Sequence, residues 1–119
     1  MLTKKEYTDK YGNKVIDYRI TKGDTFILNV KPLGDVSLIK SVEFKIGDYD
    51  YIEIMSKQFA FMPELSKYTV TLTSKETDAL KENETYRYQI VITNEADKVE
   101  TVMSGKLTPT YSIEPEEEK

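Results

Sequence analysis

Tyrosine and β-branched residues alternate with polar ones in the segment Tyr86-Arg87-Tyr88-Gln89-Ile90-Val91-Ile92. Because side chains along a β-strand point to opposite faces with a period of two, both tyrosines, Ile90 and Ile92 are predicted to line one face of a sheet. The chain contains no His and no Cys. The alternation predicts a packed sheet, and the missing residue types remove most routes to catalysis.

The same alternation recurs along the chain, interrupted by turn residues about every ten positions, which is typical of an antiparallel sandwich or barrel. Strands are predicted over residues 15–20, 25–31, 38–46, 51–55, 58–62, 68–73, 86–93 and 98–103. One short helical turn is predicted over residues 74–80, capped by Thr73 or Ser74, with Leu80 closing one end of the core. We therefore expect an all-β domain of seven to eight strands with one helical turn.

The length of 119 residues fits a single domain with one core. The expected organisation is a polar N-terminal arm or hairpin at 1–13, a β-sandwich at 14–108 and an acidic flexible tail at 109–119, kept out of the sheet by Pro109 and Pro115. The N-terminus has no apolar segment or cleavage site typical of a secretory signal, and no apolar run approaches the ~20 residues of a membrane helix. These features predict a cytosolic chain that makes no membrane contact.

The formal net charge is −4, and much of it comes from the acidic run Glu116-Glu117-Glu118 and its neighbour Glu114. The rest of the chain is therefore close to neutral. No cluster of Lys and Arg exceeds two in a row, whereas a nucleic-acid binder needs a basic surface to displace phosphate counterions. Charge therefore argues against nucleic acid as a partner.

Three segments resemble a module found near the N-terminus of upper-baseplate and related tail or neck proteins of phages that infect Gram-positive bacteria. Ile20-Thr21-Lys22-Gly23-Asp24-Thr25-Phe26 is similar to the family's I-T-R/K-G-D-S/T-F, and residues 68–77 run from a strand into an L-T-x-x-D/E-T turn. Residues 86–92 are similar to Y-x-Y-D/Q-I-x-I/V, and Gly105-Lys106-Leu107 is similar to a closing G-x-F/L. The resemblance spans residues 20–108, but residues 31–42 lack the hairpin that family members often carry there.

The resemblance implies an immunoglobulin-like β-sandwich that serves as a structural part of a phage or prophage particle. It implies contacts with other phage structural proteins or with copies of itself, a possible homo-oligomer, and a place in the host cytoplasm before assembly and in the virion afterwards. It carries over no catalytic residues. Gly23, Asp24, Leu72, Thr73 and Gly105 match as structural positions, since glycine permits turns and close backbone approach.

Asp48, Asp50 and Glu53 form the best carboxylate cluster, but they lack the further ligands of an EF-hand loop, so a solvated hairpin tip explains them better than a metal site. Tyr49 and Tyr51 flank Asp50 on this tip. Tyrosine combines a large apolar body with a polar end and is enriched at interfaces. We therefore take Tyr49, Asp50 and Tyr51 as the candidate partner contact, with ordinary surface tyrosines as the alternative.

The sequence thus predicts a non-enzymatic assembly module with no cofactor. The leading alternative is an immunoglobulin-like binding module of a bacterial cell-surface protein that contacts protein or glycan. A third possibility is a glycan hydrolase that relies on two carboxylates, although no feature selects a pair.

Overall fold

Two β-sheets enclose the apolar side chains that alternate along the strands. The computed structural model describes residues 3–31 and 36–110. Its strands are β1 (Thr3–Thr8), β2 (Lys14–Thr21), β3 (Phe26–Val30), β4 (Ile39–Gly47), β5 (Glu53–Gln58), β6 (Ala60–Met62), β7 (Lys67–Leu72), β8 (Tyr86–Asn94) and β9 (Val99–Thr110). The prediction of an all-β, immunoglobulin-like sandwich is confirmed, with nine strands in the described residues instead of seven to eight.

The predicted helical turn is α1 (Ser74–Asp78), and two 3₁₀ turns accompany it, η1 (Val36–Leu38) and η2 (Pro63–Leu65). None of the described helices has the length and apolarity to cross a membrane.

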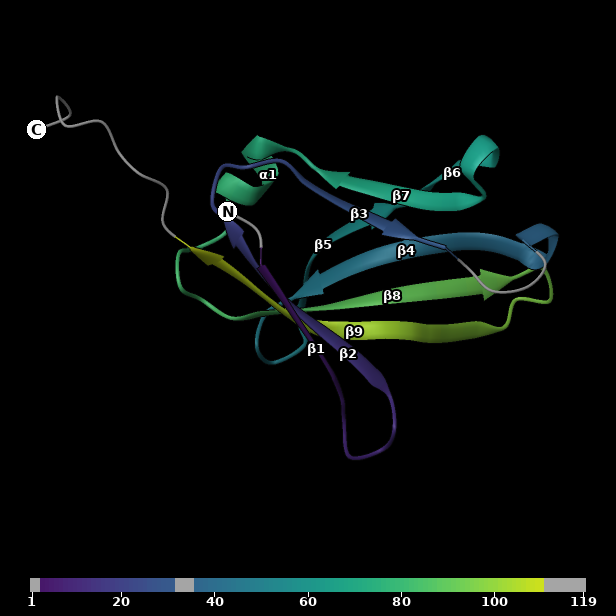
Figure 1. Cartoon of the computed structure of the whole chain (residues 1–119), viewed down its shortest axis with the longest axis horizontal. Coiled ribbons are helices and arrows are strands. Elements are labelled where there is room, and N and C mark those ends of the chain that lie inside the picture. The colour runs from purple at the N-terminus through teal and green to yellow at the C-terminus, as the bar shows by residue number, and fades with distance from the viewer. Residues whose placement is uncertain (1–2, 32–35, 111–119) are drawn as a thin grey trace, which may run out of the picture.

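The larger sheet has the strand order β1-β2-β9-β8-β4-β5, and the smaller sheet has the order β3-β7-β6 (Figure 1). Every pairing is antiparallel except that of β2 with β9, which is parallel. Phe59 joins β5 to β6, and its N–H donates to the carbonyl of Val42 on β4. The chain therefore passes from one sheet to the other at this edge, where β5 and β6 follow each other directly.

The core contains the rows that the alternation assigned to the inside. Tyr86, Tyr88 and Ile90 of β8 are buried, and Ile92 is half-buried at the end of the row. Apolar residues at alternate positions of β2, β3, β4 and β7 are buried too: Ile16, Tyr18, Ile20, Phe26, Leu28, Val42, Phe44, Ile46, Tyr68, Val70 and Leu72. Leu80 closes one end of the core, as predicted.

Aromatic rings connect the two sheets. The ring of Tyr18 on β2 meets that of Phe26 on β3 edge-on, at 5.3 Å between centroids. Edge-to-face pairs of this kind add to the stabilisation that burial alone provides. The contact places the smaller sheet's β3 over β2, so β1, whose residues are all exposed, lies beyond the cover of the smaller sheet.

The C-terminal strand differs from the prediction. The strand predicted over 98–103 begins at Val99 and continues through the following segment as one β9, which includes Pro109, so the expectation that Pro109 stays out of the sheet is wrong. Its carbonyl accepts from Asn83 N–H on the side where β8 has already ended. Because N–H and C=O of one strand residue point the same way, the missing N–H removes no ladder bond there. Most of the predicted acidic tail, residues 111–119 with Pro115, lies outside the described residues.

Gly105 allows β9 to approach β2 and Tyr88 closely. A Cβ atom at this position would lie 1.9 Å from the carbonyl oxygen of Ile16 and 2.9 Å from the ring of Tyr88. The hydroxyl of Tyr88 donates to the same carbonyl oxygen. Only glycine fits here, because any Cβ atom would overlap the Ile16 carbonyl.

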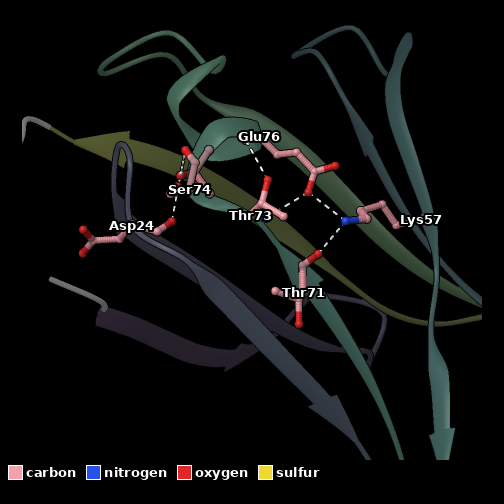
Figure 2. A network of polar contacts seen from close by, with 7 residues as sticks. Asp24, Lys57, Thr71, Thr73, Ser74 and Glu76 are labelled. Carbon is pink, nitrogen blue, oxygen red and sulfur yellow. Dashed lines mark hydrogen bonds and ion pairs between the residues drawn. The ribbon is translucent and has the colours of Figure 1, made fainter.

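Helix α1 begins with a capping box. Thr73 Oγ1 accepts from Glu76 N–H at 3.2 Å, and Glu76 Oε1 accepts from Thr73 N–H at 2.8 Å. The ammonium of Lys57 on β5 donates to Glu76 Oε1 at 2.7 Å and to the Thr71 carbonyl at 2.6 Å, as Figure 2 shows. The sequence offered Thr73 or Ser74 as the cap, and the structure selects Thr73.

The turn before β3 and helix α1 meet at Thr77, which is fully buried although polar. Its hydroxyl donates to the Asp24 carbonyl at 2.7 Å and accepts from Gly23 N–H at 3.1 Å. Lys22 adds an ion pair with Asp78 at 3.2 Å. The G-D turn before β3 and the helix after β7 are therefore locked together.

A second corner is closed by Tyr86 at the start of β8. Its hydroxyl accepts from the backbone N–H of Lys81, five residues earlier, at 2.9 Å. A tyrosine that bonds back to upstream backbone at this corner is a feature of immunoglobulin-like sandwiches.

Candidate functional site

The loop between β4 and β5 is held in shape by Asp48. Its Oδ1 accepts from the N–H groups of Asp50 at 2.9 Å and Ile52 at 3.0 Å, and its own N–H donates to the Ile52 carbonyl. An aspartate that binds backbone N–H groups two residues on stabilises a turn. The loop therefore presents Tyr49 and Tyr51 in a defined position, 56% and 65% exposed.

Arg87 of β8 lies against both of these tyrosines. Its guanidinium carbon is 4.3 Å from the ring centroid of Tyr49 and 4.5 Å from that of Tyr51. Arg87 Nε also donates to the Tyr49 carbonyl at 2.9 Å. Cation–π contacts at this distance are favourable, by about 0.5–1 kcal/mol each where exposed. We call Tyr49, Tyr51 and Arg87 the tyrosine–arginine cluster.

Sequence reasoning found the tyrosines and missed Arg87. Arg87 lies between Tyr86 and Tyr88 in the sequence, and this alternation was enough to predict that Arg87 is on the outer face of the sheet, away from the core. Its contact with the loop depends on the pairing of Arg87 with Gly47 in the β4–β8 ladder, which brings the two segments together. Asp50, the third predicted contact residue, is exposed and contributes its N–H to the loop.

Two shallow depressions in the outer face of the larger sheet flank the cluster, and both include Tyr51 and Arg87 in their walls. The first is completed by Lys45, Ile46, Gly47, Glu53 and Gln89. The second is completed by Tyr7, Asp9, Val15, Asp17, Tyr88, Gln89, Ser104, Gly105 and Lys106. Tyr51 and Arg87 of the cluster therefore border both hollows.

The carboxylates of this face are engaged by the protein itself. Asp17 Oδ1 accepts from Lys106 N–H at 2.9 Å, and Asp9 Oδ1 accepts from the N–H groups of Tyr11 and Asn13. The backbone hydrogen bonds from Asn13 and Tyr11 hold the pKa of Asp9 below its usual range. Burial and a hydrogen bond with Asp17 raise the pKa of Tyr7, while Arg87 acts weakly in the opposite direction.

Asp48, Asp50 and Glu53 lie around one loop, but the carboxylate of Asp48 already serves as the acceptor that shapes it. Within residues 3–31 and 36–110, no group of three or more His, Cys, Asp or Glu side chains is arranged to hold a metal ion. What the arrangement offers is a contact surface: two tyrosine rings, one fixed guanidinium and the hollows beside them.

The fold defines the chain as an immunoglobulin-like β-sandwich, and comparison with solved structures gives the same class. A fibronectin(III)-like module of Clostridium thermocellum CbhA is similar in structure, with a TM-score of 0.51, 14% sequence identity, and coverage of 93% of this chain and 100% of that chain. At that identity the similarity concerns the fold alone. No protein-family profile and no curated protein matches the sequence.

Proposed function

We propose that the chain is a non-catalytic interaction module that docks on a partner protein through the tyrosine–arginine cluster. The observation that carries the proposal is the state of Arg87. Its guanidinium is fixed by two tyrosine rings and one carbonyl, and among the described residues no carboxylate forms an ion pair with it. Tyrosine and arginine are the residues that most often dominate binding energy at interfaces.

A role without catalysis fits the side chains that are present. The chain has no His or Cys, so a general base or nucleophile would have to come from acids, Ser, Lys or Tyr. Near the cluster, Asp9, Asp17 and Asp48 each accept backbone N–H bonds that stabilise loops and strand pairing. The role of these carboxylates is therefore to stabilise the backbone of this surface.

We assign the module to the assembly of a phage or prophage particle, as part of a baseplate, tail or neck. The support is the resemblance of residues 20–108, whose G-D turn and E-T helix start meet at Thr77. The partners are then other structural proteins or copies of the chain, first in the host cytoplasm and later in the virion.

The second candidate is a binding module of a bacterial cell-surface protein. The fold similarity to a fibronectin(III)-like module of CbhA favours it. In this case the partner of the cluster is a protein or glycan outside the cell.

Site-specific photocrosslinking in the native host tests the proposal. A photoreactive phenylalanine analogue at Tyr49 should crosslink to a partner, whereas the same analogue at Tyr11, 76% exposed in the turn between β1 and β2, should not. Crosslinks from position 49 to particle proteins support assembly, and crosslinks to envelope components support the second candidate. Equal yields of the same products at both positions would contradict docking through the cluster.

A further inference from the structure

Four cationic side chains lie close together on the outer face of the larger sheet, on four neighbouring strands. They are Lys5 of β1, Arg19 of β2, Lys106 of β9 and Arg87 of β8, which we call the basic stripe. Lys5, Arg19 and Lys106 are exposed, and Arg87 is half-buried under the tyrosines. No run of the sequence holds more than two adjacent cations, so this concentration arises only when the strands pair in the sheet.

The register of the ladders sets this arrangement. Lys5 pairs with Asp17, Lys106 pairs with Arg87, and the hydrogen bond from Lys106 N–H to Asp17 places these two pairs side by side. In the adjacent row, Arg19 pairs with Thr3 on one side and Thr108 on the other. Directly opposed residues share a face, so all four cations point away from the core, opposite to Tyr18, Tyr86 and Leu107.

The carboxylates of the protein neutralise only part of the positive charge of the basic stripe. Lys106 and Arg87 are directly opposite each other, and like charges in that relation destabilise a strand pair. The ion pairs of the described residues use other lysines: Lys4, Lys14, Lys22, Lys40, Lys45 and Lys57. Asp17 is the one acid within the two rows, and its Oδ1 binds backbone N–H. An anionic partner would relieve this repulsion.

We propose that the basic stripe binds an acidic polypeptide segment, whose carboxylates pair with Lys5, Arg19, Lys106 and the free end of the Arg87 guanidinium. The inference rests on the proposed docking at the tyrosine–arginine cluster and specifies the chemistry of the partner. Guanidinium groups pair with carboxylates through two parallel hydrogen bonds, and Arg87 has one edge left because Nε is occupied. The neighbouring tyrosines add apolar contact area for the same segment.

A polypeptide fits this surface better than a nucleic acid. A nucleic acid needs a track of cations that neutralises successive phosphates, and its charge density is repelled by a protein that is negative overall. The stripe offers four cations interrupted by Asp17 and bordered by tyrosine rings. A few carboxylates on a flexible segment match that pattern of charge and apolar surface.

The test uses the full chain and a fluorescent peptide in which Glu alternates with Thr, with a second peptide in which Gln replaces each Glu. Fluorescence anisotropy at low ionic strength measures affinity, and ¹⁵N NMR locates the site. The acidic peptide should shift the amide signals of β1, β2, β9 and β8, and its binding should weaken as salt is added. The glutamine peptide should bind at least about tenfold more weakly.

The variant R19E/K106E should lower affinity for the acidic peptide by about tenfold or more, because two attractions become repulsions. The matched control K75E/K98E changes the net charge equally at exposed lysines of α1 and of the turn before β9, and it should bind as the parent chain does. Circular dichroism and thermal unfolding verify that both variants fold.

Three results would overturn the inference: equal affinity for the two peptides, equal loss in both variants, or tighter binding of a single-stranded oligonucleotide than of the acidic peptide. Crosslinking at Tyr49 separates this inference from the proposed function. If a partner crosslinks at position 49 equally well in the R19E/K106E variant, the docking role is supported and the acidic nature of the partner is contradicted. Peptide binding at the stripe without a partner at Tyr49 removes the docking role.

Discussion

The hydroxyl of Thr77 donates a hydrogen bond to the backbone carbonyl of Asp24, across 53 positions of sequence. The same hydroxyl accepts from Gly23 N–H, so one buried oxygen satisfies both sides of the turn before β3. The turn precedes β3, and α1 follows β7. The contact between them fixes where β3 enters the smaller sheet. It gives a structural reason for the glycine–aspartate pair in the turn before β3 and for the threonine in α1.

Replacement of Thr77 by Val should therefore destabilise the fold. Valine has nearly the same shape but removes the hydrogen bonds that the Thr77 hydroxyl makes with the Asp24 carbonyl and the Gly23 N–H, at a cost of about 1–3 kcal/mol. Urea denaturation measures the difference in free energy of unfolding. Thr77→Ser keeps the hydroxyl and should retain more stability than Thr77→Val, and a valine variant as stable as the parent would show that the bond is unimportant.

Gly105→Ala should be more damaging than an ordinary surface change. The added methyl group would overlap the Ile16 carbonyl at 1.9 Å, so β9 and β2 would have to separate and the hydrogen bond from Tyr88 would be strained. We expect a loss of about 3 kcal/mol or more, visible as a lower melting temperature or as insoluble protein. Gly12→Ala is the control, because nothing lies within 4 Å of its Cβ position and only its positive φ of 83° opposes the change.

Stability should fall at alkaline pH because of buried tyrosines. Burial raises the pKa of Tyr88, Tyr18 and Tyr68 above the usual value of 10.0. Their stabilising effect is thus fully present below pH 10, the pKa of the unfolded chain, and is lost as pH rises towards the higher folded pKa values. For Tyr88, whose pKa burial raises strongly, the slope should approach about −1.4 kcal/mol per pH unit above pH 10.

Urea denaturation at a series of pH values from 8 to 11, with the tyrosinate absorbance recorded in parallel, measures this loss. Tyr88→Phe should reduce the slope above pH 10, whereas Tyr11→Phe should not, since Tyr11 is exposed. A stability that stays constant across this range would contradict the burial of these hydroxyls.

Glu76→Gln should weaken the start of α1 and its link to β5. Hydrogen bonds from Lys57 and from Thr73 N–H lower the pKa of Glu76 below 4.5. The carboxylate therefore stabilises the fold above pH 4.5, and this effect is lost as pH falls through the lowered folded pKa. We expect a cost of about 1 kcal/mol at neutral pH, as for other capping residues.

The difference between parent and Glu76→Gln should shrink at pH 3, where the parent's Glu76 becomes increasingly protonated. Glu82→Gln, an exposed position in the loop after α1, provides the control and should leave stability nearly unchanged. A difference that does not depend on pH would assign the effect to something other than the charge of Glu76.

Local sequence was sufficient for most of the strands and for their inward faces because period-two alternation is a property of each strand alone, although β5 covers Glu53–Gln58 and not the expected 51–55. Phe26 and Leu28 face the core while Ile27 is 55% exposed, as alternation predicts. Pro109 shows the limit of such rules. Whether a missing N–H matters depends on whether a neighbouring strand is present on that side, and no local pattern contains that information.

The two tyrosines of the candidate site could be predicted from the sequence, but the arginine could not. Tyr49 and Tyr51 follow a glycine–aspartate turn signal, which marked them as exposed. Their cation, Arg87, comes from a strand whose position beside β4 depends on the whole sheet.

By itself the sequence determined which residues turn inward, where the chain turns and that α1 begins at Thr73 or Ser74, since these depend on neighbours within a few positions. Only the tertiary structure decided that β2 runs parallel to β9, and so that Lys5 and Arg19 lie near Lys106 and Arg87. Alternation fixes the face of a side chain but not the strand next to it. The choice of neighbour follows from packing the whole core, including the close approach that Gly105 permits.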